Sequence, residues 1–359
     1  MYSRRDFGKL ALVGVPAFRT MMSMKGLKID SMFDGVRLGT ITYSYNNDLP
    51  LVAGQDQIDG IIPLCQTAGV GVIELMCNHA EPASELAVQQ AAARAARMAA
   101  LAAAAPAGNA PPAAGIGAAG PGAPGAPGAA AAAGRGRGPS PEALKARDDL
   151  RQWRLSTPMS HFEGIKKKFK DAGINIFAYC VNGMGDDFTS DEIDIMFAQA
   201  RALGASTISS STTVSIAQKL VPFAEKHKYT IAYHNHAVLN DPNEVCTPES
   251  IRKILAMSPY FRSNLDIAHY VGANFDPVPF IVEIHDKITH FHIADGTKNN
   301  GREVPFGQGD TDIKAVANLL KDKKYPIVGM IELEYRPPAG SNTALEVKKC
   351  LDYVKQAMA

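Results

Sequence analysis

The sequence lacks paired cysteines, long apolar runs and an excess of charge of either sign. Its cysteines lie far apart and none forms a Cys-x-x-Cys pair, so we expect buried small side chains in place of a zinc knuckle or a disulfide framework. With 37 basic and 36 acidic residues, no positive excess favours nucleic acid as a partner. No segment reaches the ~20 apolar residues that a membrane span needs. The five cysteines are Cys65, Cys77, Cys180, Cys246 and Cys350.

The first residues carry an arginine pair. Residues 3–9 read Ser-Arg-Arg-Asp-Phe-Gly-Lys, which resembles a twin-arginine export motif, and residues 10–18 are apolar. We therefore expect residues 1–30 to be an export signal and the protein to be periplasmic. Arg19 ends the apolar stretch early and no Ala-x-Ala cleavage site follows, so a cytoplasmic protein with a plain basic N-terminus is the alternative.

Residues 31–359 suit one domain that carries an insertion. The chain has 359 residues, 46% of them hydrophobic, which matches a single α/β barrel of about 250 residues with additions. Residues 86–141 are rich in Ala, Gly and Pro. Up to about Ala105 this insertion is Ala-rich enough for a helix. The remainder cannot bury a core, so we expect it to be disordered.

Short apolar runs alternate with amphipathic stretches along the rest of the chain. This alternation predicts parallel strands joined by helices, and eight repeats favour a closed (β/α)8 barrel, with the insertion between the second and third strands. We expect strands at 37–43, 70–75, 175–179, 206–209, 230–234, 262–265, 288–292 and 327–333. We expect helices at 56–68, 160–172, 190–203, 213–227, 248–257, 277–285, 312–321 and 343–358.

Histidines and carboxylates gather where the predicted strands end. In barrels of this kind, the chemistry lies at the carboxyl ends of the strands. Imidazole and carboxylate ligands together suit a divalent ion, and the sequence does not choose among Mn, Co, Zn, Fe and Mg. We therefore predict one metal site. Its ligands would come from the fifth to eighth strands: His234, Asp266, His292 and Glu332.

Three further residues have two interpretations each. Side chains alternate along a strand, so Glu332 and Glu334 share a face; we prefer Glu332 as the ligand, with Glu334 as its rival. His269 either lines the site or caps the next helix. Glu74, on the second strand, is either a site residue or part of a buried polar layer.

Several short motifs together resemble the xylose-isomerase-like sugar phosphate isomerase/epimerase superfamily, which includes inosose dehydratases and ketose 3-epimerases. The resemblance covers roughly residues 37–359 apart from the insertion. It implies a TIM barrel with Glu, Asp, His and Glu around one divalent metal. The motifs are Ile-Glu-Leu-Met at 73–76, His-Asn-His at 234–236, Leu-Asp-Ile-Ala-His at 265–269, His-Phe-His-Ile-Ala-Asp at 290–295, Pro-Phe-Gly-Gln-Gly at 305–309 and Ile-Glu-Leu-Glu at 331–334.

The resemblance assigns roles residue by residue. Asp266, His292 and Glu332 match the last three metal ligands, His269 matches a substrate histidine, and Lys298 matches a basic residue six positions after the metal histidine.

The first ligand position departs from the family pattern. Many members have Glu-Asn-His where this chain has His234. Only two ligand carboxylates then remain, so a divalent ion would give a formally neutral site and act as a stronger Lewis acid. Epimerisation between two carboxylates is less favoured than enolisation followed by isomerisation or loss of a leaving group.

We therefore predict a metal-dependent sugar isomerase or epimerase that works through an enediolate at a carbonyl-adjacent carbon. Glu332 is the candidate base, His236 and His269 are candidate proton carriers, and Lys298 would hold a substrate oxygen. Residues that could pack against the sugar, or serve in the core, are Tyr43, Tyr45 and Phe306.

Other functions remain as alternatives. The nearest is a metal-dependent lyase or dehydratase that performs β-elimination on a keto-sugar, keto-glycoside or inosose. An apurinic-type endonuclease is less favoured, because its Asp-x-His motif is missing 13 residues beyond His292. A non-catalytic sugar-binding barrel is also less favoured, because the ligand set is intact. The expected partner is a small sugar, and a homo-oligomer is left open.

Overall fold

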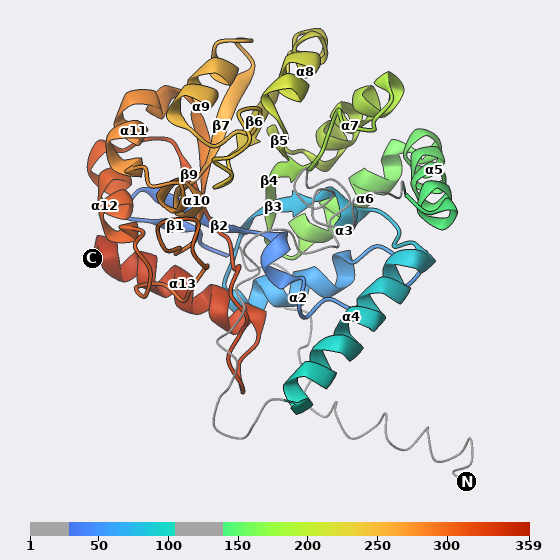
Figure 1. Cartoon of the computed structure of the whole chain (residues 1–359), viewed down its shortest axis with the longest axis horizontal. Coiled ribbons are helices and arrows are strands. Elements are labelled where there is room, and N and C mark those ends of the chain that lie inside the picture. Colours follow the sequence, from blue (N-terminus) through green and yellow to red (C-terminus); the bar gives the residue numbers. More distant parts are fainter. Residues whose placement is uncertain (1–28, 105–138) are drawn as a thin grey trace.

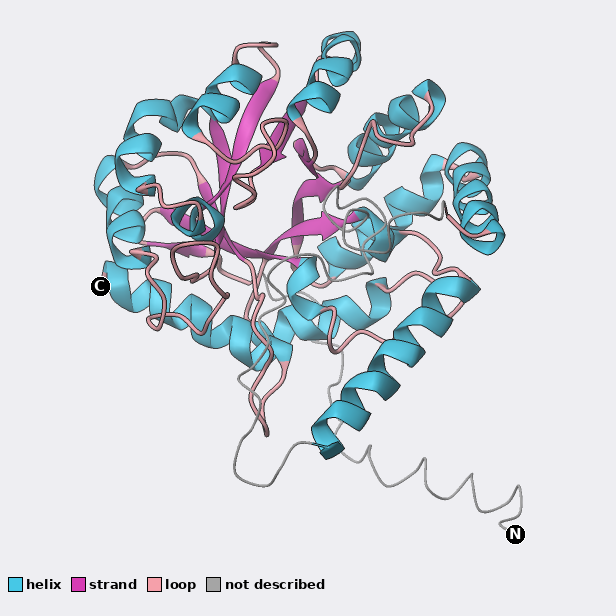
Figure 2. Cartoon of the chain, in the orientation of Figure 1, coloured by secondary structure: helices cyan, strands magenta, loops and turns pink. Residues whose placement is uncertain are grey.

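The computed structural model describes residues 29–104 and 139–359. In this part of the chain nine strands form one sheet in sequence order, and the pairing of β2 with β9 closes β2 to β9 into a parallel eight-stranded barrel. Helices encircle the strands (Figures 1 and 2), so the predicted (β/α)8 barrel is confirmed. The strands are β1 (Met32–Phe33), β2 (Val36–Ile41), β3 (Val72–Met76), β4 (Asn175–Cys180), β5 (Thr207–Ser211), β6 (Thr230–His234), β7 (Phe261–Asp266), β8 (Ile288–Ile293) and β9 (Val328–Ile331).

The helices follow the strands as expected, with several short additions and one long one, α5 of 16 residues, which was not predicted from the sequence. Capping sets their limits; Thr189 and Glu192, for example, form a capping box at the start of α7, and Gly204 ends that helix in the left-handed conformation that glycine adopts readily. The helices are α2 (Ile58–Ala68), α3 (Cys77–Ala80), α4 (Glu85–Ala104), α5 (Pro141–Ser156), α6 (Met159–Asp171), α7 (Ser190–Leu203), α8 (Val214–His227), α9 (Pro248–Leu255), α10 (Ile267–Gly272), α11 (Pro277–Ile284), α12 (Ile313–Lys323), α13 (Thr343–Met358), and the 3-10 turns η1 (Thr42–Tyr45) and η2 (His285–Lys287).

Two strands end earlier than the sequence predicts. β2 stops at Ile41, where the chain turns into η1, and β9 stops at Ile331. Ser44 in η1 is the physical reason for the second limit, because its hydroxyl accepts a hydrogen bond from the Leu333 backbone N–H (3.0 Å). Glu332 and Glu334 therefore follow the strand and do not lie within it.

The insertion lies in the crossover between β3 and β4. Its first part is helical, as α4 shows, and α4 projects away from the barrel in Figure 1. The returning helix α5 is anchored by Arg154, whose guanidinium donates to both carboxylate oxygens of Glu81 (2.7 and 2.9 Å) in a buried pair. The segment expected to be disordered includes 105–138, and the expected export signal includes 1–28; both ranges lie outside the described residues.

The inside of the barrel is layered. Val72, Glu74 and Met76 alternate with outward side chains along β3 and share one face. Val72 packs in an apolar cluster with Val328, Met330 and Phe177. All five cysteines are buried and free, as expected. Among the described helices, none has the length and apolar character to cross a membrane.

Candidate metal centre

The four predicted ligands meet at the carboxyl ends of the strands. Each offers one nitrogen or oxygen, and these atoms all lie within 4.8 Å of one another: His234, Asp266, His292 and Glu332. All four side chains are buried. Register explains the meeting, because Asp266, the last residue of β7, pairs with His292, the penultimate residue of β8. The structure thus brings together the set that the sequence predicts.

Unsatisfied atoms provide a test of whether this set suits a metal. Two of the buried ligand atoms, His234 Nδ1 and Asp266 Oδ2, have no hydrogen-bond partner, and the other two, His292 Nδ1 and Glu332 Oε2, lie 2.7 Å from each other. Buried polar atoms in folded proteins are usually paired, so two unpaired atoms beside an imidazole–carboxylate contact require an explanation. Two imidazole nitrogens and two carboxylate oxygens are a ligand set that divalent transition metals accept. The residues present therefore fit a divalent ion.

A hydrogen-bonded amide holds two of these strand ends together. Asn235, between His234 and His236, donates its side-chain N–H to the Asp266 carbonyl (3.0 Å) and accepts the Asp266 backbone N–H (2.9 Å). The exchange ties the end of β6 to the end of β7. As a result, the relative position of His234 and Asp266 is set by the backbone.

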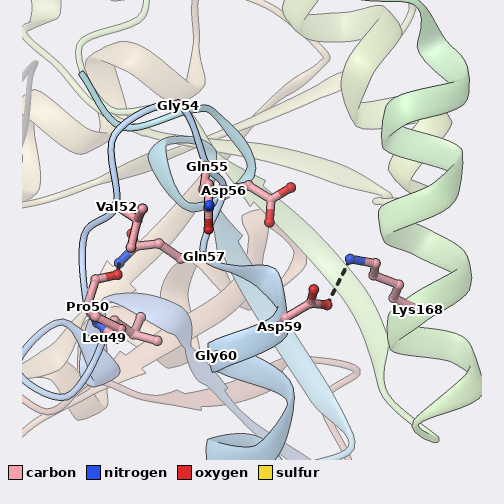
Figure 3. Close-up of a pocket in the computed structure, with 10 residues that line it drawn as sticks. All are labelled: Leu49, Pro50, Val52, Gly54, Gln55, Asp56, Gln57, Asp59, Gly60 and Lys168. Carbon is pink, nitrogen blue, oxygen red and sulfur yellow. Dashed lines mark hydrogen bonds and ion pairs between the residues drawn. The ribbon is translucent and has the colours of Figure 1, made fainter. Parts of the chain in front are cut away.

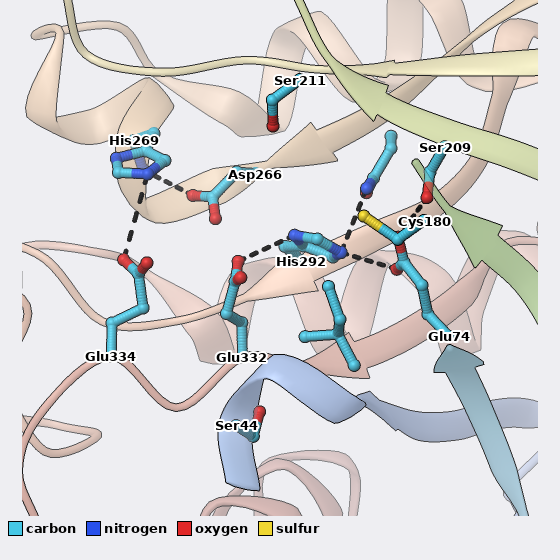
Figure 4. A network of polar contacts seen from close by, with 12 residues as sticks. Ser44, Glu74, Cys180, Ser209, Ser211, Asp266, His269, His292, Glu332 and Glu334 are labelled. Atoms are coloured by element: carbon cyan, nitrogen blue, oxygen red, sulfur yellow. Dashed lines mark hydrogen bonds and ion pairs between the residues drawn. The ribbon is translucent and has the colours of Figure 1, made fainter. Parts of the chain in front are cut away.

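Glu74 lies beneath the four residues and contacts two histidines. Its Oε2 is 2.7 Å from His292 Nε2 and 3.1 Å from His290 Nε2, and its other oxygen accepts from the Ser209 hydroxyl (Figure 4). With the His292 Nε2 directed to Glu74, its Nδ1 faces the candidate ligands and lies 2.7 Å from Glu332 Oε2. Of the two interpretations of Glu74, the geometry favours a buried polar layer that orients a site residue.

Burial and charge act oppositely on the titrating groups. Burial, followed by the neighbouring histidines, holds the pKa of His234 well below its usual value, which keeps its imidazole neutral and able to bind metal. Burial would lower the pKa of His292 too, but the carboxylates of Glu332 and Glu74 outweigh it and raise that pKa. Burial opposes ionisation of Glu74, yet His292 and His290 hold its pKa well below the ordinary value.

The two predicted proton carriers lie at the edge of the centre. The His236 and His269 rings are 4.9 and 5.7 Å from the His234 ring, centroid to centroid. His236 Nδ1 is 3.2 Å from Glu244 Oε1. His269 lies in α10, which begins directly after β7, and its backbone N–H donates to Asp266 Oδ1 (2.6 Å). His269 thus contributes its backbone to the N-terminal cap formed by Asp266, while its ring reaches the site.

Two more carboxylates lie beside the centre. Glu334 Oε2 is 3.9 Å from His269 Nε2, and Glu303 Oε1 is 4.0 Å from His269 Nδ1. Burial and then the charge of Asp266 raise the pKa of Glu303 to about 9. Sequence reasoning considered Glu334 only as a rival of Glu332 and missed Glu303. The only feature of the sequence that could have indicated Glu303 is its position as a carboxylate in the loop between the histidine of the seventh barrel strand and the Gly-rich turn.

Other candidates lie elsewhere. Lys298 is exposed in the loop after β8, and its backbone N–H donates to Asp310, so its part in the site stays a prediction. Tyr45 is fully buried in the core, and Phe306 packs edge-to-face on Tyr353. Burial, followed by the charges of Glu334 and Glu332, raises the pKa of Tyr43, so its hydroxyl lies within the field of these two carboxylates.

An open surface pocket of about 390 Å³ is separate from the centre (Figure 3). It lies between the loop before α2 and helix α6, where Lys168 pairs with Asp59 (2.8 Å). None of the four candidate ligands lines it. We therefore do not assign the site to this pocket.

Known proteins share this fold. The family model described as xylose isomerase-like TIM barrel matches residues 143–355. No curated protein sequence matches the chain. Similar solved structures are the IolI protein with a bound zinc atom (13% identity, 89% of this chain and 97% of that one, TM-score 0.53), L-ribulose 3-epimerase (13%, 90% and 94%, 0.51) and the probable 3-DHS dehydratase AsbF of Bacillus anthracis (13%, 88% and 98%, 0.51). At these identities the likeness shows the fold.

Proposed function

The chain belongs to the xylose isomerase-like TIM barrel family, and we propose that it is a divalent-metal-dependent sugar isomerase or epimerase. The observation that carries the proposal is the set of four buried ligand atoms, two of them without a hydrogen-bond partner, that converge from three strand ends and from the residue after a fourth strand. The ion would be Mn, Co, Zn, Fe or Mg, held by His234, Asp266, His292 and Glu332. When bound, it would supply Lewis acidity next to a substrate carbonyl and so acidify the neighbouring C–H.

The side chains around the centre would handle the proton. Glu332 is the candidate base for the carbonyl-adjacent carbon, because its carboxylate faces the centre and burial raises its pKa above that of an exposed glutamate. His236 and His269 would carry protons between substrate oxygens, each with a ring within 6 Å of the His234 ring. Lys298 would bind a substrate oxygen when its loop contacts the bound substrate.

Two neighbours support this proposal by their chemistry. The IolI protein binds zinc, and the other is an L-ribulose 3-epimerase, so the fold accommodates both a transition metal and proton transfer on a sugar.

A lyase or dehydratase is the second candidate. His234 stands where a second basic carboxylate is needed for symmetric epimerisation, whereas β-elimination needs one base and a separate acid for the leaving group. Glu332 and His269 come from different elements and could fill these two roles. A dehydratase among the structural neighbours is compatible with this outcome.

Metal analysis tests the site. Purified protein should retain about one ion more than the His234→Ala and Glu332→Ala variants. His285→Ala is the control, because the His285 ring stacks on Tyr325 and is not a candidate ligand, and it should match the wild type. If both site variants keep the full metal content of the wild type, the proposed ligand set is wrong.

Product analysis separates the two reactions. Incubation with free ketoses should interconvert them if the protein is an isomerase or epimerase. Incubation with 3-keto-glucosides should release the aglycone if it is a lyase. Aglycone release without ketose interconversion would exclude the isomerase.

We also propose that residues 1–30 direct export, on the strength of the Arg4-Arg5 pair. Replacing both with lysine should move the protein from the periplasmic to the cytoplasmic fraction; an unchanged distribution would contradict the proposal.

A further inference from the structure

We propose that Ser44 is a positioning residue that sets the direction of Glu332, the candidate base and one of the four candidate ligands. The inference goes beyond the proposed function, on which it rests, because it gives a role to a residue outside the ligand set. Ser44 lies in η1, the turn after β2, and is 2% exposed. Figure 4 shows it on this turn, with the Glu332 carboxylate directed away from it and toward His292.

The Ser44 hydroxyl contacts the peptide groups on both sides of Glu332. It donates to the Ile331 carbonyl (3.3 Å) and accepts the Leu333 backbone N–H (3.0 Å). A serine hydroxyl has one proton and two lone pairs, so both bonds can form at once. Each peptide group is planar, and the two planes that flank a residue define its φ and ψ. One hydroxyl therefore fixes the backbone from which the Glu332 side chain projects.

This bridge lies where backbone pairing on one side ends. Thr40 and Ile331 are the last paired residues of β2 and β9, because β2 then turns into η1. On the other side, the Glu332 backbone N–H still donates to the Ile293 carbonyl of β8 (3.0 Å). The Ser44 hydroxyl thus takes the place of the backbone partner that β2 no longer supplies.

The neighbouring hydroxyl of Thr40 does not duplicate the bridge. Its Oγ1 is 2.8 Å from the Ile331 carbonyl oxygen and 3.2 Å from Ser44 Oγ. Its contact with the segment is with the peptide group before Glu332. Thr40 therefore holds one of the two planes, whereas Ser44 holds both.

The direction of Glu332 decides whether its carboxylate meets the other ligand atoms. Its Oε2 lies 2.7 Å from His292 Nδ1. Residues that orient a ligand are worth about 10–100-fold in metal affinity. Leu333 is buried, so loss of the hydroxyl leaves a buried N–H without this acceptor and the segment shifts to find another. The ion would then keep its other ligands and bind more weakly.

Two measurements on the full-length chain test this role. Titration with Mn²⁺ and EPR detection of the free ion gives the number of ions and the Kd. Hydrogen exchange of the metal-free protein, followed by mass spectrometry of the peptide at 328–335, reports on the bridge itself. Ser210→Ala is the matched control, because the buried Ser210 hydroxyl also donates to a backbone carbonyl, that of Val181 (2.7 Å), on other strands.

We expect Ser44→Ala to bind as many ions as the wild type with a Kd about tenfold higher. Its 328–335 peptide should exchange faster without metal. Ser44→Thr, which keeps the hydroxyl, should restore the wild-type Kd to within about threefold. Ser210→Ala should match the wild type in both measurements. Circular dichroism checks folding, and Ser44→Cys replaces Ser44→Ala if the latter does not fold.

The outcomes separate this role from the proposed function. A Ser44→Ala variant with the wild-type Kd, or one whose Kd rises no more than that of Ser210→Ala, would overturn the positioning role. If the wild type binds no Mn²⁺, the proposed ligand set fails, and hydrogen exchange decides the rest. Faster exchange in Ser44→Ala alone would then support the bridge, and unchanged exchange would overturn it.

Discussion

The Oε2 atom of Glu74 lies 2.7 Å from the Nε2 atom of His292, and neither side chain is more than 3% exposed. The pair is a carboxylate–histidine contact directed away from the atoms that would bind metal. It orients the His292 ring so that the other ring nitrogen, Nδ1, is directed to the candidate ligands.

Glu74→Gln should therefore weaken metal binding without removing the site. The amide still accepts a hydrogen bond but loses the charge, and partners of this kind are worth about 10–100-fold in metal affinity. Titration with Mn²⁺ at fixed pH should show a higher Kd with the number of ions unchanged. An unchanged Kd would mean that Glu74 serves only the packing of the barrel.

His234→Glu should retain the metal, unlike His234→Ala. Glutamate supplies a ligand oxygen in place of the imidazole nitrogen and adds a negative charge to the site. We expect ion binding at least as tight as in the wild type, and a rise in ketose 3-epimerisation relative to isomerisation, because two carboxylates then face the substrate. Product ratios by sugar chromatography check this. If the ratio of epimerised to isomerised product equals that of the wild type, the histidine at position 234 does not disfavour epimerisation as proposed.

Asp295→Asn should loosen the loop that follows β8. One oxygen of Asp295 accepts the N–H groups of Gly307 (2.7 Å) and Gly309 (3.0 Å), and the other accepts that of Thr311 (3.3 Å). An amide would leave at least one of these donors unpaired, at a cost of about 2 kcal/mol in the free energy of unfolding.

Urea unfolding measures this loss, and Gly309→Ala is a second variant in the same contact. An added Cβ there would lie 2.2 Å from Asp295 Oδ1, so the loop would have to move. Metal content should be unchanged in both variants, because Asp295 is not among the grouped ligands. Equal stability of Asp295→Asn and wild type would show that the loop does not depend on this carboxylate.

Glu192 should make the protein sensitive to acid. Burial would raise its pKa, but hydrogen bonds from Arg147 and Arg151 (each 2.8 Å) lower it to about 2, below the ordinary value of 4.5. A carboxylate with a depressed pKa in the folded state stabilises the protein above its unfolded pKa, and this stability is lost as pH falls. The loss should run from about pH 4.5 towards pH 2.

The expected magnitude is about 1–3 kcal/mol, with screening at the partly exposed arginines favouring the lower end. In urea, Glu192→Gln should be less stable than the wild type at pH 6, and the difference should shrink at pH 3. Glu283→Gln is the control, because Glu283 is exposed and this variant loses only a surface ion pair with Arg252. A difference that is equal at both pH values would contradict the ionic origin.

Local patterns predicted the regular elements well. The strand at 230–234 and the helices at 190–203 and 343–358 have the predicted limits, because side-chain periodicity and caps act within a few residues of each other. The predicted C-terminal limits of β2 and β9 were wrong by two residues, because the chain turns into η1 after Ile41 and a contact between Ser44 and Leu333, distant in sequence, follows the end of β9.

The candidate ligands could also be predicted from the sequence, whereas the carboxylate of Glu303 beside them could not. Parallel strands in a closed barrel bring their carboxyl ends together, so His234, Asp266, His292 and Glu332 could be grouped from their positions alone. Glu303 belongs to an irregular loop with no periodicity that would indicate its direction.

The sequence by itself determined the barrel and the strand ends that carry its histidines and carboxylates, since alternation and strand order are local properties. Tertiary structure alone decided that Glu74 orients His292 and that Glu334 and Glu303 both lie beside His269. These relations depend on distances between side chains far apart in the chain, which only barrel closure and the packing of its loops set.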